Sequence, residues 1–285
     1  MRFLSLFAGT VLLRPYVFAF LAVYLLAAVP AWGWRRTGLY LLLGYFLAWA
    51  AEYSSIHNGF PFGLYGYISG PTSGRELWVQ GVPFMDSLSF VFLSFAGLQT
   101  ARFLLEPLEL AKGRLWRLRW ADGGRLPGLK AWLLAGLLTM GLDVIIDPVA
   151  LQGGRWFLGR IYSYPSGGPY FGVPLSNFVG WALVGWAITG AFLLLERALL
   201  RHWLGPWRGY DGDAALGIAL FAGVLAFNLT ITFAIGEVGM ALAGCLWSVG
   251  MLWPALARVK QIVRATSAWP DQLAGEAGQD GVEAA

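Results

Sequence analysis

Long apolar runs separated by short polar segments dominate this chain. Seven runs approach the roughly 20 residues that a helix needs to cross about 30 Å of hydrocarbon. They cover residues 16–34, 38–54, 83–105, 129–147, 174–195, 214–235 and 238–257. The pattern predicts an all-α fold, a polytopic bundle of about seven transmembrane helices.

The composition supports a membrane protein rather than a soluble one. Apolar residues make up 58% of the 285 positions and charged residues 13%, against about 25% charged residues in soluble domains. After Trp269 the sequence PDQLAGEAGQDGVEAA is acidic and has no apolar periodicity. We therefore expect a transmembrane helical domain over residues 1–265 and a disordered C-terminal tail over 266–285.

Basic residues gather in alternate segments between the runs. The basic segments are residues 35–36, 112–130, 197–208 and 258–264. The positive-inside rule places such segments in the cytoplasm. We expect a multi-pass protein of the cell (cytoplasmic) membrane with its N-terminus outside and its C-terminus in the cytoplasm. Because topology explains the basic loop, no nucleic-acid partner is expected.

Two aspartates interrupt the fourth run, in the segment GLDVIIDPVALQGGRW from Gly141 to Trp156. Asp143 and Asp147 are four residues apart and therefore share one face of a helix. A carboxylate inside a membrane is costly, so its default interpretation is a functional or paired group that faces the protein interior. Asp147 precedes Pro148 and has a second interpretation, as the residue that ends the helix in contact with water.

Three more polar residues are expected at the same depth as these aspartates. At about 1.5 Å per residue, Asp143 lies roughly 20 Å above the cytoplasmic end of its helix. Glu52, Asp86 and Asn177 fall in the same outer half on three other predicted helices. The predicted layer thus holds five polar side chains. The sequence leaves open how far apart they lie in the plane of the membrane.

A weak internal repeat groups these residues. GVPFMD at 81–86 matches GVPLSN at 172–177 with an offset of 91, which also pairs Glu52 with Asp143 and Asp86 with Asn177. The pairing indicates a parallel internal repeat of helices 2–3 and 4–5, an arrangement that often places a site at the repeat interface. A chance match is the alternative, since the identities are few.

The two outer loops of this repeat are rich in aromatic residues. Gly and Pro alternate with Phe and Tyr in NGFPFGLYGYISGPTSG at 58–74 and in IYSYPSGGPYFGVP at 161–174. Such loops suit a flat apolar partner. The alternative is an aromatic belt at the membrane interface, where Tyr and Trp are enriched in any case.

The sequence lacks the residue patterns that metal sites and nucleotide-binding sites usually need. His57 and His202 lie on opposite sides of the expected topology, and Cys245 is the single cysteine. No Gly-rich phosphate-binding motif of Walker or Rossmann type occurs. We therefore expect no metal site and no cofactor.

Taken together, these motifs are similar to those of a known family. Glu52, GFPFGLYGY (59–67), the GVP of 81–83, DVIIDP (143–148) and YFGVPLSNFVGW (170–181) carry the resemblance, which covers about residues 50–185. The pattern resembles the membrane carotenoid-biosynthesis family that includes hydratases of gamma-carotene, lycopene-type and bisanhydrobacterioruberin ends. VPFMDSLSFVFLS at 82–94 departs from the more uniformly apolar span that the family leads us to expect, which leaves the substrate open.

The resemblance implies an enzyme, a carotenoid hydratase (hydro-lyase) that needs no redox cofactor. It would add water to the terminal isopropylidene double bond of an acyclic carotenoid end and give a tertiary 1-hydroxy end group. A buried carboxylic acid favours its neutral form, so one member of the cluster is expected to act as general acid while another orients water. The expected catalytic residues are Glu52, Asp143 and Asp147, and the expected substrate-binding residues are Asp86, Asn177, Tyr65, Tyr67, Tyr170 and Trp181.

Other functions stay open at this point. A proton-coupled transporter would also carry buried carboxylates, although more often near the midplane. A membrane prenyltransferase would need Asp-rich magnesium sites, and a noncatalytic carotenoid-binding or assembly protein would need none of this chemistry. The expected partners are an acyclic carotenoid in the bilayer, membrane lipid and other carotenoid-pathway enzymes.

Overall fold

The fold is an all-α bundle that suits a membrane. A computed structural model describes residues 2–72, 74–111, 114–122 and 125–279. Among these residues, six helices are long and apolar enough to cross a membrane. They are α2 (Pro15–Trp32), α4 (Phe84–Leu105), α5 (Leu129–Leu151), α6 (Leu175–Leu195), α8 (Asp213–Ala234) and α9 (Val238–Gln279). The prediction of a multi-pass all-α membrane bundle is confirmed.

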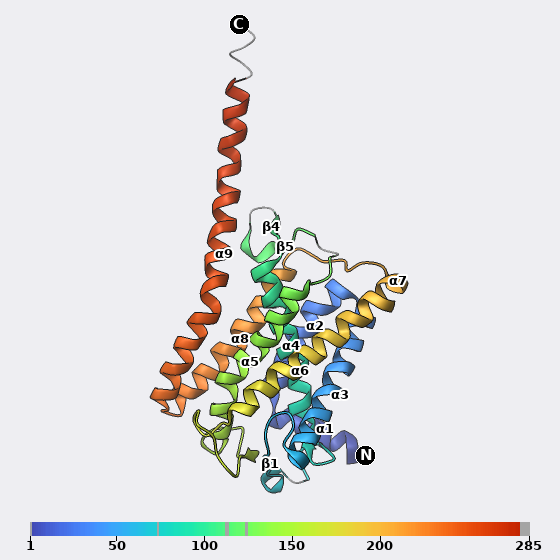
Figure 1. The fold of residues 1–285 in the computed structure, drawn as a ribbon, viewed down its shortest axis with the longest axis vertical. Helices are drawn as coiled ribbons and strands as arrows, with labels where there is room; N and C mark the ends of the chain where they lie inside the picture. Colours follow the sequence, from blue (N-terminus) through green and yellow to red (C-terminus); the bar gives the residue numbers. More distant parts are fainter. Residues whose placement is uncertain (1, 73, 112–113, 123–124, 280–285) are drawn as a thin grey trace.

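The window 38–54 forms α3 (Trp34–Asn58), which is less apolar than the other six. It carries Arg35, Arg36 and Glu52 within its length. α2 carries the chain to one end of the bundle and α4 starts at the other, so α3 runs the length of the bundle between them (Figure 1). With α3 the bundle has seven long helices among the described residues, as the apolar windows predict.

The remaining elements are short and lie at the two ends of the bundle. In the described part of the chain, the strands form three two-stranded antiparallel sheets, in which β1 pairs with β6, β2 with β3 and β4 with β5. The strands are β1 (Gly66–Tyr67), β2 (Trp78–Val79), β3 (Val82–Pro83), β4 (Leu108–Leu110), β5 (Leu118–Trp120) and β6 (Tyr162–Ser163). Short helical pieces are α1 (Arg2–Leu13), α7 (Arg201–Leu204), a π-helical turn at Glu196–Leu200 and 3-10 turns at Gly70–Thr72, Leu115–Arg117 and Gly153–Arg155.

α4 is the central helix, buried over most of its length against α2, α3, α5 and α8. Close packing between α4 and α5 depends on Gly97, because a Cβ there would lie 2.5 Å from the Thr139 hydroxyl oxygen. Small residues let membrane helices approach each other in this way. On the other side of α4, Phe90 stacks on Trp181 of α6 with ring centroids 3.9 Å apart. α4 therefore joins both halves of the predicted repeat.

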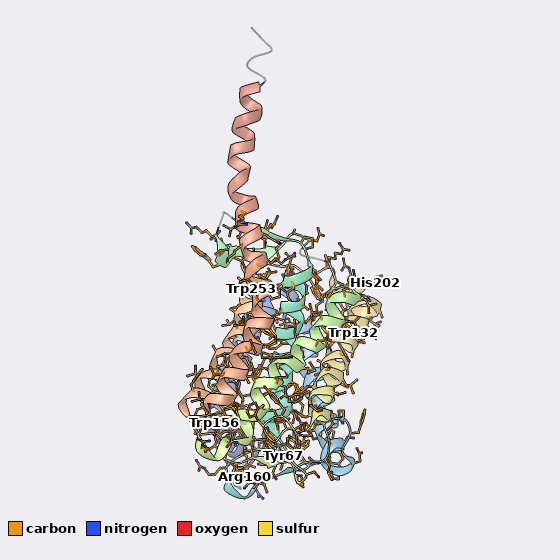
Figure 2. All side chains as sticks on the ribbon, turned by 60° about the vertical axis from the view of Figure 1, so that its left-hand side comes forward. Tyr67, Trp132, Trp156, Arg160, His202 and Trp253 are labelled. Atoms are coloured by element: carbon orange, nitrogen blue, oxygen red, sulfur yellow. The ribbon has the colours of Figure 1, made fainter. Side chains whose placement is uncertain are left out.

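The two ends of the bundle differ in what they carry. The loops 59–83 and 152–174 lie at one end together with α1, whereas β4, β5 and α7 lie at the other (Figure 1). Figure 2 shows Tyr67, Trp156 and Arg160 at the first end and His202 near the opposite one. The segments rich in Lys and Arg lie at the end that carries β4, β5 and α7.

Helix α9 extends into the C-terminal part of the chain. The backbone of α9 is helical through Gln279 and projects beyond the bundle (Figure 1), whereas a disordered tail is expected from residue 266. Helix α9 thus continues past the proposed boundary without a break. Residues 280–285 lie outside the described part of the chain, and the division at residue 265 stays a prediction.

The expected orientation can be tested by cysteine labelling from each side of the membrane. After Cys245 is replaced by Ser, Arg117→Cys should react only with reagent on the cytoplasmic side, because it lies at the Lys- and Arg-rich end. Ser166→Cys, in the exposed loop at the other end, should react only from outside. Labelling of position 117 from outside contradicts the orientation, and the Cys245→Ser protein alone is the background control.

Candidate active site

A cavity lies inside the bundle at the end formed by the two aromatic loops. Its volume is about 100 Å³, several times the ~10–15 Å³ that one water needs. The helices α2, α3, α4, α5, α6 and α8 and both loops contribute to its wall. The polar lining residues are Tyr16, Glu52, Tyr65, Tyr67, Asp86, Ser89, Asp143, Asp147, Trp156, Tyr162, Tyr164, Asn177, Trp181 and Asn228.

Glu52 and Asp86 meet on one side of the cavity through two tyrosines of the first loop. Glu52 is buried in the last turns of α3, and Asp86 lies in the first turn of α4. The hydroxyls of Tyr65 and Tyr67 both contact Oε2 of Glu52. The Tyr67 hydroxyl also contacts Oδ2 of Asp86. One phenol therefore links two carboxyl groups that come from different helices.

Asp143 and Asp147 meet on the other side of the cavity, one turn apart on α5. Tyr162 donates to Oδ1 of Asp147, and Tyr164 donates to its Oδ2 at 3.0 Å. The side-chain amide of Asn177, in the first turn of α6, donates to Oδ2 of Asp143 at 2.6 Å and to Oδ2 of Asp147 at 3.0 Å. Both aspartates are buried. Asp147 accordingly lies inside the site, and Pro148 sits within α5 instead of ending it.

The two sides of the cavity are built alike. Tyr-Gly-Tyr at 65–67 and Tyr-Ser-Tyr at 162–164 contain β1 and β6, which pair antiparallel as two-fold related strands would. Each tyrosine pair places two hydroxyls on one carboxyl group. By these contacts, the counterpart of Glu52 is Asp147, whereas the offset of 91 in the sequence pairs Glu52 with Asp143. The second tyrosine pair follows the first by 97 residues, so the loops differ in length and a single offset misses this correspondence.

The four tyrosines remain hydrogen-bond donors. Burial raises the pKa of Tyr65, Tyr67, Tyr162 and Tyr164 well above the usual value for a phenol, and the nearby carboxyl groups raise it further. Each phenol therefore keeps its proton at neutral pH and directs it at a carboxyl oxygen.

The rest of the cavity wall is apolar and aromatic, contributed by Phe20, Phe92, Val224, Phe227 and others. On the side of α2 and α8, Tyr16 stacks on Phe227 with ring centroids 5.1 Å apart. Phe157, which packs against both rings, is 56% exposed on the surface of the bundle. The aromatic wall thus continues from the cavity to the exposed surface of the bundle.

Most of the residues expected at the site lie together. Glu52, Asp86, Asp143, Asp147, Asn177, Tyr65, Tyr67 and Trp181 all line the cavity. Tyr170 does not line it, because its ring packs on Phe171 and Phe178 and its backbone pairs with Val173. The sequence analysis missed Tyr162 and Tyr164, although the repeated Tyr-x-Tyr pattern could have indicated them. In the described part of the chain, His, Cys, Asp and Glu side chains form no group of three suited to a metal ion.

Two comparisons with known proteins relate this chain to carotenoid biosynthesis. Residues 11–251 match the model of a family described as carotenoid biosynthesis protein. A curated relative, the bisanhydrobacterioruberin hydratase of Haloarcula japonica, is 29% identical over an alignment of 221 residues that covers 75% of this chain. The chain spans 64% of the length of that relative. No solved structure matches this chain.

Proposed function

This chain belongs to the carotenoid biosynthesis protein family, and we propose that it is a carotenoid hydratase. It would add water to the terminal isopropylidene double bond of an acyclic carotenoid and give a tertiary 1-hydroxy end group. The Haloarcula japonica relative, a bisanhydrobacterioruberin hydratase, supports this proposal. The observation that carries the proposal is a hydrogen-bonded group of four carboxyls, four phenols and one amide that lines a cavity whose remaining wall is largely aromatic and apolar.

Hydration of an unactivated alkene needs a proton donor, a stabilised tertiary cation and a positioned water. Carboxyl groups held by phenols supply a donor and an acceptor of protons on opposite sides of the cavity. The ring face of Trp181 lines the same space and can attract a cation, an interaction worth on the order of 0.5–2 kcal/mol. Asn177 holds Asp143 and Asp147 in fixed positions.

The shape of the cavity also suits a long apolar substrate. The polyene would lie among acyl chains beside α2 and α8, and its end group would enter past Tyr16, Phe157 and Phe227. The carboxyl groups lie at the inner end of this path, near the loops of the bundle. The double bond at the end of the polyene would therefore meet acid and water while the rest stays in hydrocarbon.

The proposed reaction starts with proton transfer from a carboxylic acid to the CH carbon of the double bond. The π electrons form the new C–H bond, and the adjacent carbon becomes a tertiary cation. A lone pair of water forms the C–O bond, and the proton that water releases goes to a carboxylate. Return of this proton to the acid completes the cycle, so one water is consumed and no oxidant or reductant is needed.

Isotope labelling tests the proposal directly. Membranes that contain the protein should convert lycopene, which has isopropylidene ends, to a hydroxylated product. In oxygen-18 water the product should gain one label per hydrated end, and in deuterium oxide it should gain one carbon-bound deuterium, both measured by mass spectrometry. Oxygen derived from O2, or loss of conversion without O2, contradicts hydration. A transporter or a noncatalytic carotenoid-binding protein gives no labelled product at all, and membranes without the protein are the control.

A further inference from the structure

The oxygen contacts around Glu52 require more hydrogens than the tyrosines carry. Three short contacts are present: Tyr65 with Glu52, Tyr67 with Glu52, and Tyr67 with Asp86. The hydroxyls of Tyr65 and Tyr67 also lie 3.4 Å apart, which is too long for a strong hydrogen bond between two oxygens, and this contact is not counted. Each hydrogen bond between two oxygens uses one hydrogen, and each phenol has one to donate. Two phenols therefore serve two contacts, and the third needs a hydrogen from a carboxyl group. Either Glu52 or Asp86 must carry it.

Around Asp147, the tyrosines and Asn177 carry enough hydrogens for all of the short contacts, so no carboxyl proton is needed. Tyr162 and Tyr164 each give one hydrogen to the Asp147 carboxylate, and the amide of Asn177 gives one to Asp147 and one to Asp143. The backbone carbonyl of Asp147 lies 3.4 Å from the Tyr162 hydroxyl, again too long to count as a strong hydrogen bond. Two phenols and one NH₂ group supply four hydrogens, which equals the number of these contacts. Asp147 thus receives three donors, as an ionised carboxylate prefers. The two sides of the cavity, alike in construction, differ in their need for a proton.

The charges around the cavity agree with this difference. None of the described residues that line the cavity is Lys, Arg or His. The buried cation Arg14 lies at the same end of the bundle, but Glu76 pairs with it at 2.8 Å. Four negative charges without a cation in one buried space would be very costly. At least one proton must therefore be held by this cluster, and the contacts place it beside Tyr67.

We infer that Glu52 and Asp86 share one proton through Tyr67, and that this trio is the acid that protonates the double bond, whereas Asp147 receives the proton from water. The inference rests on the proposed function and gives Asp86 a catalytic part in place of the substrate contact expected from the sequence. Tyr67 can accept a hydrogen from Asp86 while it donates its own to Glu52. The shared proton thus reaches the substrate by a relay: Asp86 gives its proton to Tyr67 as Tyr67 gives its own to Glu52, and Glu52 passes this one proton to the double bond.

Infrared difference spectroscopy can locate this proton without any turnover. The full-length protein in lipid nanodiscs, with no carotenoid added, is compared with each variant in the carbonyl-stretch region of protonated carboxyl groups. Glu52→Gln and Asp86→Asn should each remove a band equivalent to one carboxylic acid, because the new amide N–H supplies the missing hydrogen. The matched variants Asp147→Asn and Asp143→Asn should retain the band.

The outcomes separate this inference from the proposed function. A band that is lost in Asp147→Asn and retained in both Glu52→Gln and Asp86→Asn overturns the assignment, and so does the absence of any carboxylic acid band in the unmodified protein. Because no substrate is present, a protein that fails to hydrate lycopene can still show the band. Variants are compared only after size-exclusion chromatography and thermal unfolding show an intact fold, and Glu52→Gln and Asp86→Asn test the same proton twice.

Discussion

Glu52→Gln and Asp147→Asn are each expected to reduce the hydration of lycopene by about 10²–10⁴-fold, the usual contribution of a general acid or base. The amides keep the size of the original side chains and can still bond to the tyrosines, so the protein should remain in the membrane in normal amounts. The product formed per unit of protein, measured by chromatography of extracted pigments, reports the loss. Activity close to that of the unmodified protein contradicts the proposed roles.

The double variant tests whether the two carboxyl groups act in one reaction. Residues that work as a unit give strongly non-additive losses, so Glu52→Gln with Asp147→Asn should cost little more than either change alone. Losses that multiply indicate separate purposes. Glu109→Gln is the matched control, because Glu109 is exposed at the opposite end of the bundle and pairs with Arg119.

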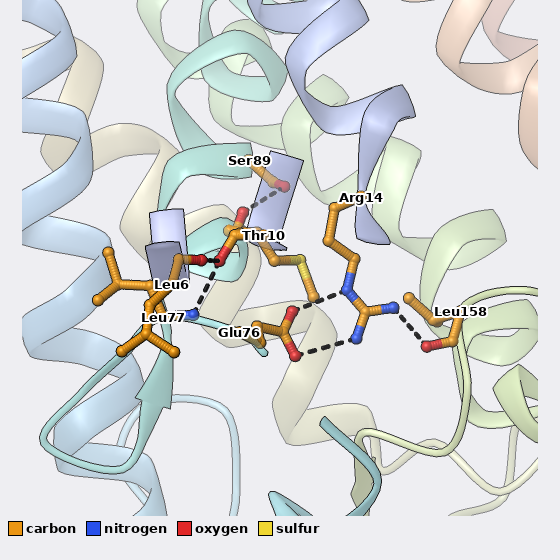
Figure 3. A network of polar contacts seen from close by, with 8 residues as sticks. Leu6, Thr10, Arg14, Glu76, Leu77, Ser89 and Leu158 are labelled. Atoms are coloured by element: carbon orange, nitrogen blue, oxygen red, sulfur yellow. Dashed lines mark hydrogen bonds and ion pairs between the residues drawn. The ribbon is translucent and has the colours of Figure 1, made fainter. Parts of the chain in front are cut away.

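The second large effect is expected at the ion pair between Arg14 and Glu76, which holds the site end of the bundle together. The side chains are 1% and 0% exposed, and Arg14 joins the start of α2 to the first loop through Glu76 and to the second loop through the carbonyl of Leu158 (Figure 3). Glu76→Gln leaves a buried guanidinium without its partner charge, which typically costs roughly 3–5 kcal/mol.

Unfolding of the purified protein in detergent, followed by circular dichroism against denaturant, measures this cost. Arg14→Met combined with Glu76→Leu should be less destabilising than Glu76→Gln alone, because no unpaired charge is left buried. Asp122→Asn is the matched control, since its pair with Arg125 is exposed and such pairs contribute about 0–1 kcal/mol. Equal effects of Glu76→Gln and Asp122→Asn are incompatible with a structural role for the buried pair.

The sequence was sufficient to predict the helices and the depth of the polar residues. A chain in hydrocarbon must satisfy its backbone hydrogen bonds internally, so apolar runs of about 20 residues form helices whatever their neighbours are. The rise along a helix is constant, so counting residues places Glu52 and Asp143 at similar depth. The sequence also predicts that the basic segments share one side, and in the structure they lie at one end of the bundle.

Only the tertiary structure decided which of these residues touch. Depth follows from local geometry, whereas the lateral neighbours of a side chain depend on how helices separated by many residues pack and rotate. That packing joins Glu52 to Asp86 through Tyr67 and makes Asp147, not Asp143, the counterpart of Glu52. It also directs Tyr162 and Tyr164 into the cavity, where β6 pairs with β1. Tyr170 stays outside, because its ring packs on Phe171 and Phe178.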